Sequence, residues 1–245
     1  MNDIKTALGK YLSDKSYNNL SLKAVLFDMD GVLYDSMTNH VHAWVKIMDS
    51  YGFNMTIEDG YLHEGRTGDD TINIISKREG KETTPEERIR IYQSKIDEFS
   101  SLPDILPMKK SLELLQKVKE DELFAMLVTG SGQPTLLDSL NNSFPGIFTR
   151  ERMITSHDVK RGKPNPEPYL TALRKGDLKP NEAIVVENAP LGVEAAHAAG
   201  LFVIAVNTGP LPDSVLLDAG ANFLLPSVEA LYNEWDNIYT IINEG

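Results

Sequence analysis

The chain of 245 residues is long enough to bury one sizeable core together with a smaller insert. Its formal net charge of -12 disfavours nucleic acid and anionic membranes as partners, because both carry charge of the same sign. It has no cysteine, which excludes disulfide bonds and thiolate chemistry. The polar N-terminus lacks the apolar run of a signal peptide, and no stretch approaches the length of a membrane-spanning helix, so we expect a cytoplasmic enzyme.

Six short apolar runs follow an N-terminal extension, residues 1–20, that reads as helical or loosely structured. The runs are continuously apolar rather than alternating, which is typical of strands buried on both faces. They cover residues 23–27, 124–128, 153–155, 183–186, 202–206 and 222–225. Helical patterns at residues 109–119, 167–174 and 191–199 separate most of them. This alternation predicts an α/β fold with a doubly wound parallel (Rossmann-like) sheet and helices on both sides.

Residues 37–106 interrupt the alternation. They contain helical patterns at residues 41–51, 69–78 and 85–99 but no convincing buried strand, and they are too long for a loop within a compact domain. We therefore predict a small α-helical domain inserted after the first strand. The core domain would then consist of residues 21–36 and 107–245.

Four polar clusters lie at or close to the ends of predicted strands, where ligands bind in open α/β sheets. In the first, KAVLFDMDGVLYDS, Asp28 ends the apolar run, Asp30 follows, and Gly31 permits a tight turn. Two carboxylates this close repel each other unless a cation or a shared proton relieves them. A plain strand-end turn, in which Asp and Gly are common, accounts for the bare pattern about as well.

Two further clusters offer groups that bind anions. In LVTGSGQ, Thr129, Gly130 and Ser131 follow a strand, where hydroxyls and free backbone amides form an anion cradle or simply begin a helix. In KRGKPNPEPYL, Lys163 is held extended by Pro164 and would supply the cation that an acidic site needs. The alternative is that Lys163 is a solvated surface residue, as single lysines usually are.

The fourth cluster, AIVVENAPLGVEAAHAAG, brings Glu187 and Asn188 to the end of another strand. A carboxylate and a carboxamide are hard oxygen ligands that suit Mg²⁺. The alternative is a strand-end turn in which Asn188 caps the next helix. All four clusters would meet at one edge of the sheet.

In this order, the four segments resemble the four motifs of the haloacid dehalogenase-like (HAD) hydrolases, and the resemblance covers residues 23–245. The helical insert is similar to the cap domain of that family. The stretches DGVLYDS, GKPNPEPY and ENAPLGVEAA, with His40, Ala43 and Trp44, resemble its β-phosphoglucomutase-like subgroup.

The resemblance implies that Asp28 is the nucleophile, which forms an aspartyl-phosphate, and that Asp30 is the general acid and base. It also implies a bound Mg²⁺ ion, with the Asp28 carboxylate, the Asp30 backbone carbonyl and Asn188 as ligands and Glu187 beside them. The transferring phosphoryl group would be held by Thr129, Gly130, Ser131 and the catalytic Lys163. Asp30 argues against dehalogenation, because a halide leaving group needs no proton.

The loop YLHEGRTGDD in the insert departs from the mutases that it resembles. In β-phosphoglucomutases the matching loop carries basic residues that hold a second phosphate, but here Glu64 stands in place of the lysine and Gly68 in place of the arginine. Arg66 retains some positive charge, and His40 lies near the start of the first cap helix. Glu64 would reach Mg²⁺ when the cap closes, unless it is simply solvated. Tyr92 would hydrogen-bond a phosphate or this glutamate, or be a partly buried helix residue.

Three functions follow from these patterns. The first is a Mg²⁺-dependent phosphohydrolase of a small phosphorylated molecule, with inorganic pyrophosphate preferred because HEGRTG, Tyr92 and ENAPLG resemble a pyrophosphatase branch of the subgroup. The alternative is a β-phosphoglucomutase that interconverts β-glucose 1-phosphate and glucose 6-phosphate. A non-catalytic interaction protein on the same scaffold would tolerate loss of Asp28, Asp30 or Lys163, all of which are present. The sequence leaves the oligomeric state open.

Overall fold

The structure, a computed structural model, describes residues 3–132 and 136–244. Within them, six strands form one parallel sheet in the order β3-β2-β1-β4-β5-β6. The strands are β1 (Ala24–Phe27), β2 (Phe124–Val128), β3 (Met153–Ile154), β4 (Ala183–Glu187), β5 (Phe202–Val206) and β6 (Phe223–Leu225). Each coincides with a predicted apolar run to within one residue at either end. The predicted doubly wound parallel sheet is therefore confirmed.

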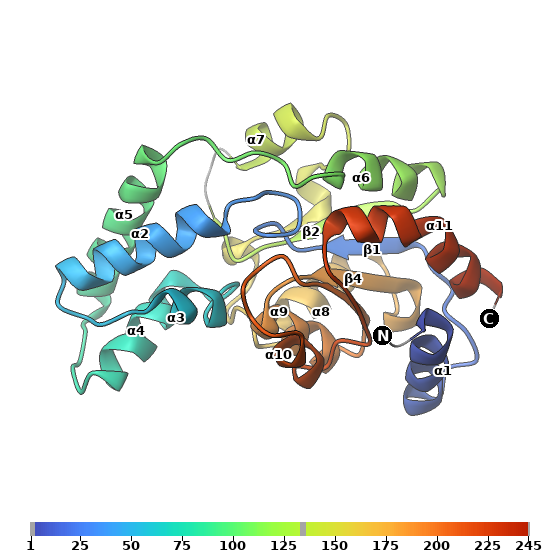
Figure 1. Cartoon of the computed structure of the whole chain (residues 1–245), viewed down its shortest axis with the longest axis horizontal. Helices are drawn as coiled ribbons and strands as arrows, with labels where there is room; N and C mark the ends of the chain where they lie inside the picture. The colour runs from blue at the N-terminus through green and yellow to red at the C-terminus, as the bar shows by residue number, and fades with distance from the viewer. Residues whose placement is uncertain (1–2, 133–135, 245) are drawn as a thin grey trace.

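Helices cover both faces of this sheet (Figure 1). The first face carries α1 (Ile4–Lys15), α6 (Ser111–Glu120), α7 (Leu136–Ser143) and α11 (Val228–Glu244). The second face carries α8 (Glu167–Gly176), α9 (Pro190–Ala198) and α10 (Asp213–Asp218). Short 3-10 turns lie at Arg150–Arg152, Ser156–Asp158 and Pro180–Glu182. Within the described ranges, none of the helices is both long and apolar enough to cross a membrane.

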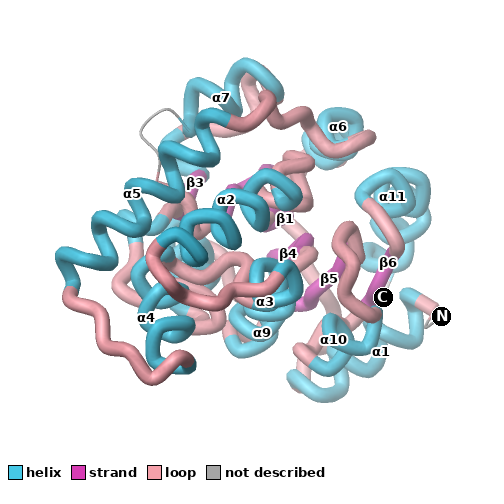
Figure 2. The backbone as a smooth tube through the Cα atoms, turned by 60° about the vertical axis from the view of Figure 1, so that its left-hand side comes forward, coloured by secondary structure: helices cyan, strands magenta, loops and turns pink. Residues whose placement is uncertain are grey.

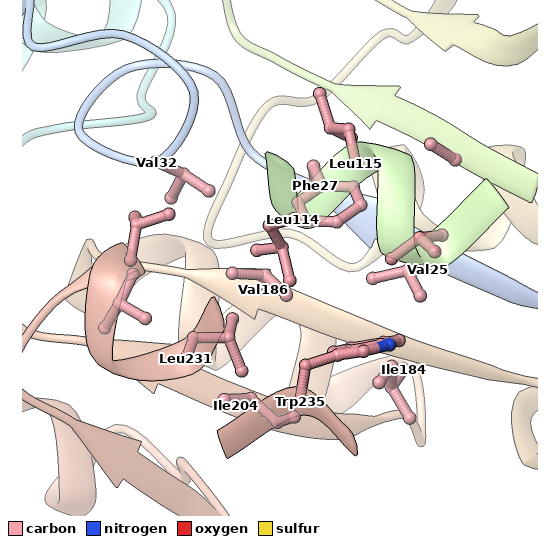
Figure 3. Close-up of a cluster of buried hydrophobic side chains, with 14 of the residues drawn as sticks. Val25, Phe27, Val32, Leu114, Leu115, Ile184, Val186, Ile204, Leu231 and Trp235 are labelled. Atoms are coloured by element: carbon pink, nitrogen blue, oxygen red, sulfur yellow. The ribbon is translucent and has the colours of Figure 1, made fainter. Parts of the chain in front are cut away.

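The central strand β1 shows why the strands read as unbroken apolar runs. Val25 and Phe27 point into the hydrophobic cluster under α6 and α11, where Trp235 is fully buried (Figure 3). Ala24 and Leu26 point to the opposite face and pack under α8 and α9. Because helices cover both faces, neither set of alternate side chains reaches water, and the strand is apolar at every position.

A separate group of helices lies on one side of the sheet, at the left of Figure 1 and seen from another angle in Figure 2. These are α2 (Met37–Ser50), α3 (Ile57–Leu62), α4 (Gly68–Arg78) and α5 (Pro85–Ser101). Residues 37–106, all of them described, contain no strand. The group has its own small core of Met48, Phe53, Met55, Ile72, Ile75 and Ile91. We propose that residues 37–106 form a cap domain, and we use the names cap for them and core for the other described residues.

Helix α3 was not predicted. It spans six residues, too few for a clear periodic pattern. It is stabilised by a capping box in which the Thr56 side chain accepts from the Asp59 backbone N–H and the Asp59 side chain accepts from the Thr56 N–H. The helix leads directly into the loop that carries Glu64.

The N-terminal segment, to which the sequence assigned no role, packs on the core as α1. Ile4 and Leu8 are buried in the first hydrophobic cluster. The Tyr11 hydroxyl donates a 2.8 Å hydrogen bond to the Gly200 carbonyl, and its ring meets Phe202 edge-on at 5.3 Å. The segment therefore helps to cover the first face of the sheet near the start of β5.

Candidate active site

The carboxyl ends of β2, β1 and β4 lie side by side at the point where the strand order changes direction. This switch point is where open α/β sheets bind their ligands. Asp28 continues β1 by donating its backbone N–H to the Val186 carbonyl at 3.0 Å. Asp30 lies two residues further, in a turn made possible by Gly31 at a φ of 79°. Both predicted aspartates therefore stand at the centre of the crevice.

Lys163 reaches this point from the segment before α8. Its Nζ contacts Asp28 Oδ1, and it donates to Glu187 Oε1 at 2.6 Å and to the Val128 carbonyl at 3.1 Å. The side chain is 2% exposed, so the alternative of a solvated lysine is wrong. Burial alone would lower the pKa of Lys163, but the carboxylates of Asp28 and Glu187 raise it well above its ordinary value. Lys163 is therefore a charged ammonium held against the candidate nucleophile.

Glu187 is fully buried and uses both of its carboxylate oxygens. Oε1 accepts from Lys163 and from the Tyr169 hydroxyl at 2.9 Å. Oε2 accepts from the backbone N–H groups of Asn188 and Ala189 at 2.9 and 3.0 Å. In this arrangement Glu187 orients Lys163 and shapes the loop after β4, while its predicted place beside a metal stays a prediction.

Asn188 joins the core to the cap. Its Nδ2 donates to Glu64 Oε1 at 2.8 Å, and both side chains are buried, Glu64 being 9% exposed. The alternative of a solvated Glu64 is therefore wrong. Asn188 does not cap the next helix either, since Ala189 is the N-cap residue that directly precedes α9. Within the described residues, Asn188 Oδ1 is buried without a hydrogen-bond partner. A methyl group on Gly31 would lie 2.0 Å from Asn188 Nδ2, so this position has no room for a side chain.

Asp30 is held by a chain of groups that leads into the cap. Its Oδ1 accepts from Ser36 Oγ at 2.6 Å and lies 3.1 Å from His40 Nε2. The other His40 nitrogen, Nδ1, lies 2.6 Å from Lys95 Nζ. An ammonium can only donate, so His40 accepts from Lys95 and donates to Asp30. Burial alone would raise the pKa of Asp30, but His40 and Ser36 outweigh it and lower the pKa to about 2.

Sequence reasoning missed Ser36 and Lys95. Ser36 ends the stretch DGVLYDS and could have been found as a hydroxyl close to the aspartates. Lys95 had no such signal, because it is one lysine within the helical pattern of α5. Its burial comes from aromatic neighbours, with Nζ 5.4 Å from the Trp44 ring and 4.9 Å from the Phe99 ring. Burial lowers the pKa of Lys95 to about 8.

Core and cap residues line one cavity of about 80 Å³ above Asp28. The loop after β2 forms one wall, where the Ser131 backbone N–H donates to Thr129 Oγ1 at 3.0 Å. The predicted site residues in the lining are Asp28, Asp30, Thr129, Gly130 and Ser131 from the core, and His40, Glu64, Arg66 and Tyr92 from the cap. The structure thus brings the predicted substrate-binding residues of both parts to the same space.

Tyr92 fills the space beside Gly68. A methyl group on Gly68 would lie 2.2 Å from Tyr92 Cδ2, and the Tyr92 ring stacks near Trp44 with 6.1 Å between centroids. An arginine at position 68 would therefore have no room unless Tyr92 moved. Arg66 lines the cavity, and its Nε is buried without a partner among the described residues.

The charges in this site fit a divalent cation. Burial, with the carboxylates of Glu187 and Asp30, raises the pKa of Asp28 although Lys163 acts in the opposite direction. Burial and the Asp28 carboxylate raise the pKa of Glu64 well above its ordinary value. The unpartnered amide oxygen of Asn188 adds a further hard donor next to these acids. Among the described residues no group of three or more His, Cys, Asp or Glu side chains forms a ready-made metal cluster, so a cation here would combine carboxylate with amide and backbone oxygens.

Comparisons with known proteins agree with this geometry. Residues 25–206 match the family model of the haloacid dehalogenase-like hydrolases. A phosphorylated carbohydrates phosphatase of Thermotoga maritima is 32% identical over 222 residues, covering 86% of this chain and 97% of that protein. A beta-phosphoglucomutase of Bacillus subtilis is 26% identical over 223 residues, covering 88% of this chain and 96% of that protein.

A solved structure from Bacteroides vulgatus, assigned provisionally as a beta-phosphoglucomutase, is 54% identical, covers 98% of both chains and has a TM-score of 0.95. The family match includes β1, β2, β4 and β5 with the loops that carry Asp28, Asp30, Lys163 and Asn188. Together these similarities make the protein a HAD-type enzyme. This chain therefore belongs to the haloacid dehalogenase-like hydrolases and, within them, to the β-phosphoglucomutase-like subgroup.

Proposed function

We propose that the protein is a Mg²⁺-dependent phosphohydrolase whose substrate is inorganic pyrophosphate. The observation that carries the proposal is the 2.8 Å hydrogen bond from Asn188 Nδ2 to Glu64 Oε1. It keeps a cap carboxylate among the acids around Asp28. A sugar with a second phosphate would meet repulsion there, whereas a compact diphosphate neutralised by a divalent cation would not.

The size of the cavity supports a compact substrate. Its volume is about 80 Å³, whereas a single water needs about 10–15 Å³. The ring of Tyr92 takes up the space beside Gly68, and Glu64 takes up the space above Asn188. These two cap side chains narrow the cavity, which favours a compact anion.

The reaction would proceed in two steps on Asp28. The Asp28 carboxylate attacks one phosphorus of pyrophosphate and the bond to the bridging oxygen breaks. Asp30 donates a proton to the departing phosphate, and because its pKa in the free enzyme is about 2 it must take up that proton in the substrate complex. A water then attacks the phosphorus of the aspartyl-phosphate while Asp30 accepts its proton, which restores Asp28. Lys163, the hydroxyls of Thr129 and Ser131 and the backbone amide of Gly130 would hold the equatorial oxygens during both steps.

Asp28, Asn188 and the Asp30 backbone carbonyl would hold the Mg²⁺ ion, with Glu64 in reach of it. When bound, the ion would supply the positive charge that lets an anionic nucleophile approach an anionic phosphoryl group. The unpartnered Asn188 Oδ1 supports this assignment, because a buried amide oxygen without a partner is costly unless something binds it.

The test is a substrate comparison with purified enzyme and Mg²⁺. Pyrophosphate, β-glucose 1-phosphate and glucose 6-phosphate are supplied separately, and orthophosphate and the two sugar phosphates are measured. The proposal expects rapid orthophosphate release from pyrophosphate and no isomerisation of either sugar phosphate. Efficient isomerisation with little pyrophosphate hydrolysis would reject it.

The second candidate is sugar-phosphate chemistry, as a phosphatase or as a β-phosphoglucomutase. The functions of the relatives favour it, since one is a phosphatase of phosphorylated carbohydrates and another a beta-phosphoglucomutase. Glu64 and Gly68 argue against it, because neither supplies positive charge for a second phosphate. The same substrate comparison separates the two candidates.

A further inference from the structure

The segment of residues 61–67 brings the cap against the core at three core glycines. A methyl group on Gly130 would lie 3.0 Å from the Gly65 carbonyl oxygen, and one on Gly162 would lie 2.7 Å from Thr67 Cγ2. One on Gly209 would lie 3.4 Å from Tyr61 Cδ1. These three glycines come from three different loops of the core and contact the segment that carries Glu64.

The backbone does not explain why these positions are glycine. None of the three has a φ in the left-handed region, which is where Gly31 and Gly65 lie. A left-handed backbone is therefore not what requires glycine at these positions. At Gly130 and Gly162 the space that the cap segment occupies accounts for glycine, whereas the 3.4 Å at Gly209 is an ordinary van der Waals contact.

The tightest of the contacts joins Gly162 to Thr67. The Thr67 hydroxyl caps α4: it accepts from the Asp70 backbone N–H at 3.2 Å and donates to Asp70 Oδ2 at 2.8 Å. These bonds fix the rotamer, so the methyl group cannot turn away from Gly162 without giving up the cap of α4. A small cavity of about 10 Å³ beside this contact has room for no more than one water. A side chain at position 162 would therefore displace the cap segment itself.

We propose that Gly162 and Thr67 form a closure contact that positions the cap segment, and with it Glu64, over the catalytic cavity. Both are positioning residues, since neither contacts the reacting groups: Gly162 acts by leaving space, and Thr67 acts by filling it. The inference rests on the proposed function at one point only, which is the role of Glu64 as the group that the contact positions over the cavity. The steric contact itself is independent of which phosphate is hydrolysed.

The test is a double-mutant cycle of wild type, Gly162→Ala, Thr67→Ser and the double variant. Thr67→Ser removes Cγ2 and keeps the hydroxyl that caps α4. Pyrophosphate hydrolysis with Mg²⁺ is measured for all four proteins. We expect Gly162→Ala to lower kcat/KM about tenfold or more, which corresponds to about 1.4 kcal/mol. Thr67→Ser alone should lower kcat/KM by less than Gly162→Ala does, because it leaves a gap at the contact rather than a clash, and the double variant should recover most of the loss caused by Gly162→Ala.

A second readout follows the cap itself. Trp44 lines the cavity, whereas Trp235 is fully buried in the core. In a Trp235→Phe background, quenching of Trp44 fluorescence by iodide should increase in Gly162→Ala and return to the wild-type level in the double variant. The thermal midpoint shows whether each variant is folded.

Two results would overturn the inference. One is a Gly162→Ala enzyme that hydrolyses pyrophosphate as fast as wild type. The other is a double variant as slow as Gly162→Ala, which would assign the loss to the backbone next to Lys163. If the wild type does not hydrolyse pyrophosphate, the proposed function fails by itself, and the same cycle with p-nitrophenyl phosphate decides whether the closure contact holds.

Discussion

The side-chain amide of Asn188 donates to the Glu64 carboxylate at 2.8 Å, and this bond ties the end of β4 to the cap. It places an acid of the cap beside the candidate nucleophile Asp28, and it leaves the other Asn188 oxygen buried without a partner among the described residues. The substrate and metal assignments both depend on this pair.

Replacing Glu64 tests the role of the cap. Glu64→Ala should lower kcat/KM for pyrophosphate more than tenfold, a change in barrier of about 1.4 kcal/mol, because the cap no longer supplies a carboxylate to the cation. The matched control is Glu82→Ala, which removes the same charge from an exposed position of the cap. Steady-state phosphate release measures both. Turnover of Glu64→Ala equal to that of the control would remove Glu64 from the mechanism.

Lys163 should be needed for both rate and stability. Lys163→Met keeps the length of the side chain but leaves Asp28 and Glu187 without their shared cation. We expect kcat to fall about 100-fold or more, and the free energy of unfolding to fall by about 3 kcal/mol. Lys160→Met, three residues earlier and exposed, is the control and should change neither quantity. A variant at position 163 with wild-type kcat would contradict the assignment.

Removal of the metal should abolish activity reversibly. Exhaustive chelation should stop pyrophosphate hydrolysis, and added Mg²⁺ should restore it. Asn188→Ala should raise the Mg²⁺ concentration for half-maximal activity by about tenfold or more, in the range seen when groups that support a metal are lost. A Mg²⁺ titration of Asn188→Ala that overlays that of wild type would show that the amide does not take part.

The ion pair between Asp59 and Arg78 should give the cap a pH-dependent stability. Arg78 donates to both Asp59 oxygens, at 2.5 and 3.0 Å, which links the start of α3 to the end of α4. Burial alone would raise the pKa of Asp59, but hydrogen bonds from Arg78 and Thr56 lower it from 3.8 to about 2. A lowered pKa stabilises the fold above the ordinary value, and this contribution is lost as the pH falls from about 4 toward about 2.

Arg78→Ala should therefore lower the free energy of unfolding at neutral pH by about 0.5–1 kcal/mol, a modest effect because the exposed Arg78 is screened by water. The difference from wild type should shrink as the pH falls below 4, as Asp59 becomes protonated in both proteins. Denaturant titrations at several pH values measure it, with the exposed Lys77→Ala as control. A difference independent of pH would contradict the lowered pKa.

The sheet could be predicted from the sequence because its strands are buried on both faces. Continuous apolar runs of four or five residues, as at Ala24–Phe27 and Phe202–Val206, are typical of buried parallel strands when helices separate them. The parallel arrangement then brings the residues after β1, β2 and β4 to one edge, so Asp28, Thr129 and Asn188 could be expected to meet. Their positions followed from the pattern, whereas their roles stay predictions.

What the sequence did not reveal depends on contacts between distant segments. Lys95 becomes part of the site only because Trp44 and Phe99 enclose its ammonium next to His40. Tyr169 joins the site through its hydroxyl bond to Glu187, although its position on α8 reads as an ordinary buried aromatic. The packing of α1 on the core likewise depends on long-range contacts rather than on any local motif.

The most direct test of the central claim is to trap the phosphorylated enzyme. Wild-type protein is mixed rapidly with ³²P-labelled pyrophosphate and Mg²⁺, quenched in acid before the steady state and digested. The label should appear on the peptide that contains Asp28, and hydroxylamine should release it, as it does from acyl phosphates. Steady release of orthophosphate with no label on the protein at any time would contradict nucleophilic attack by Asp28.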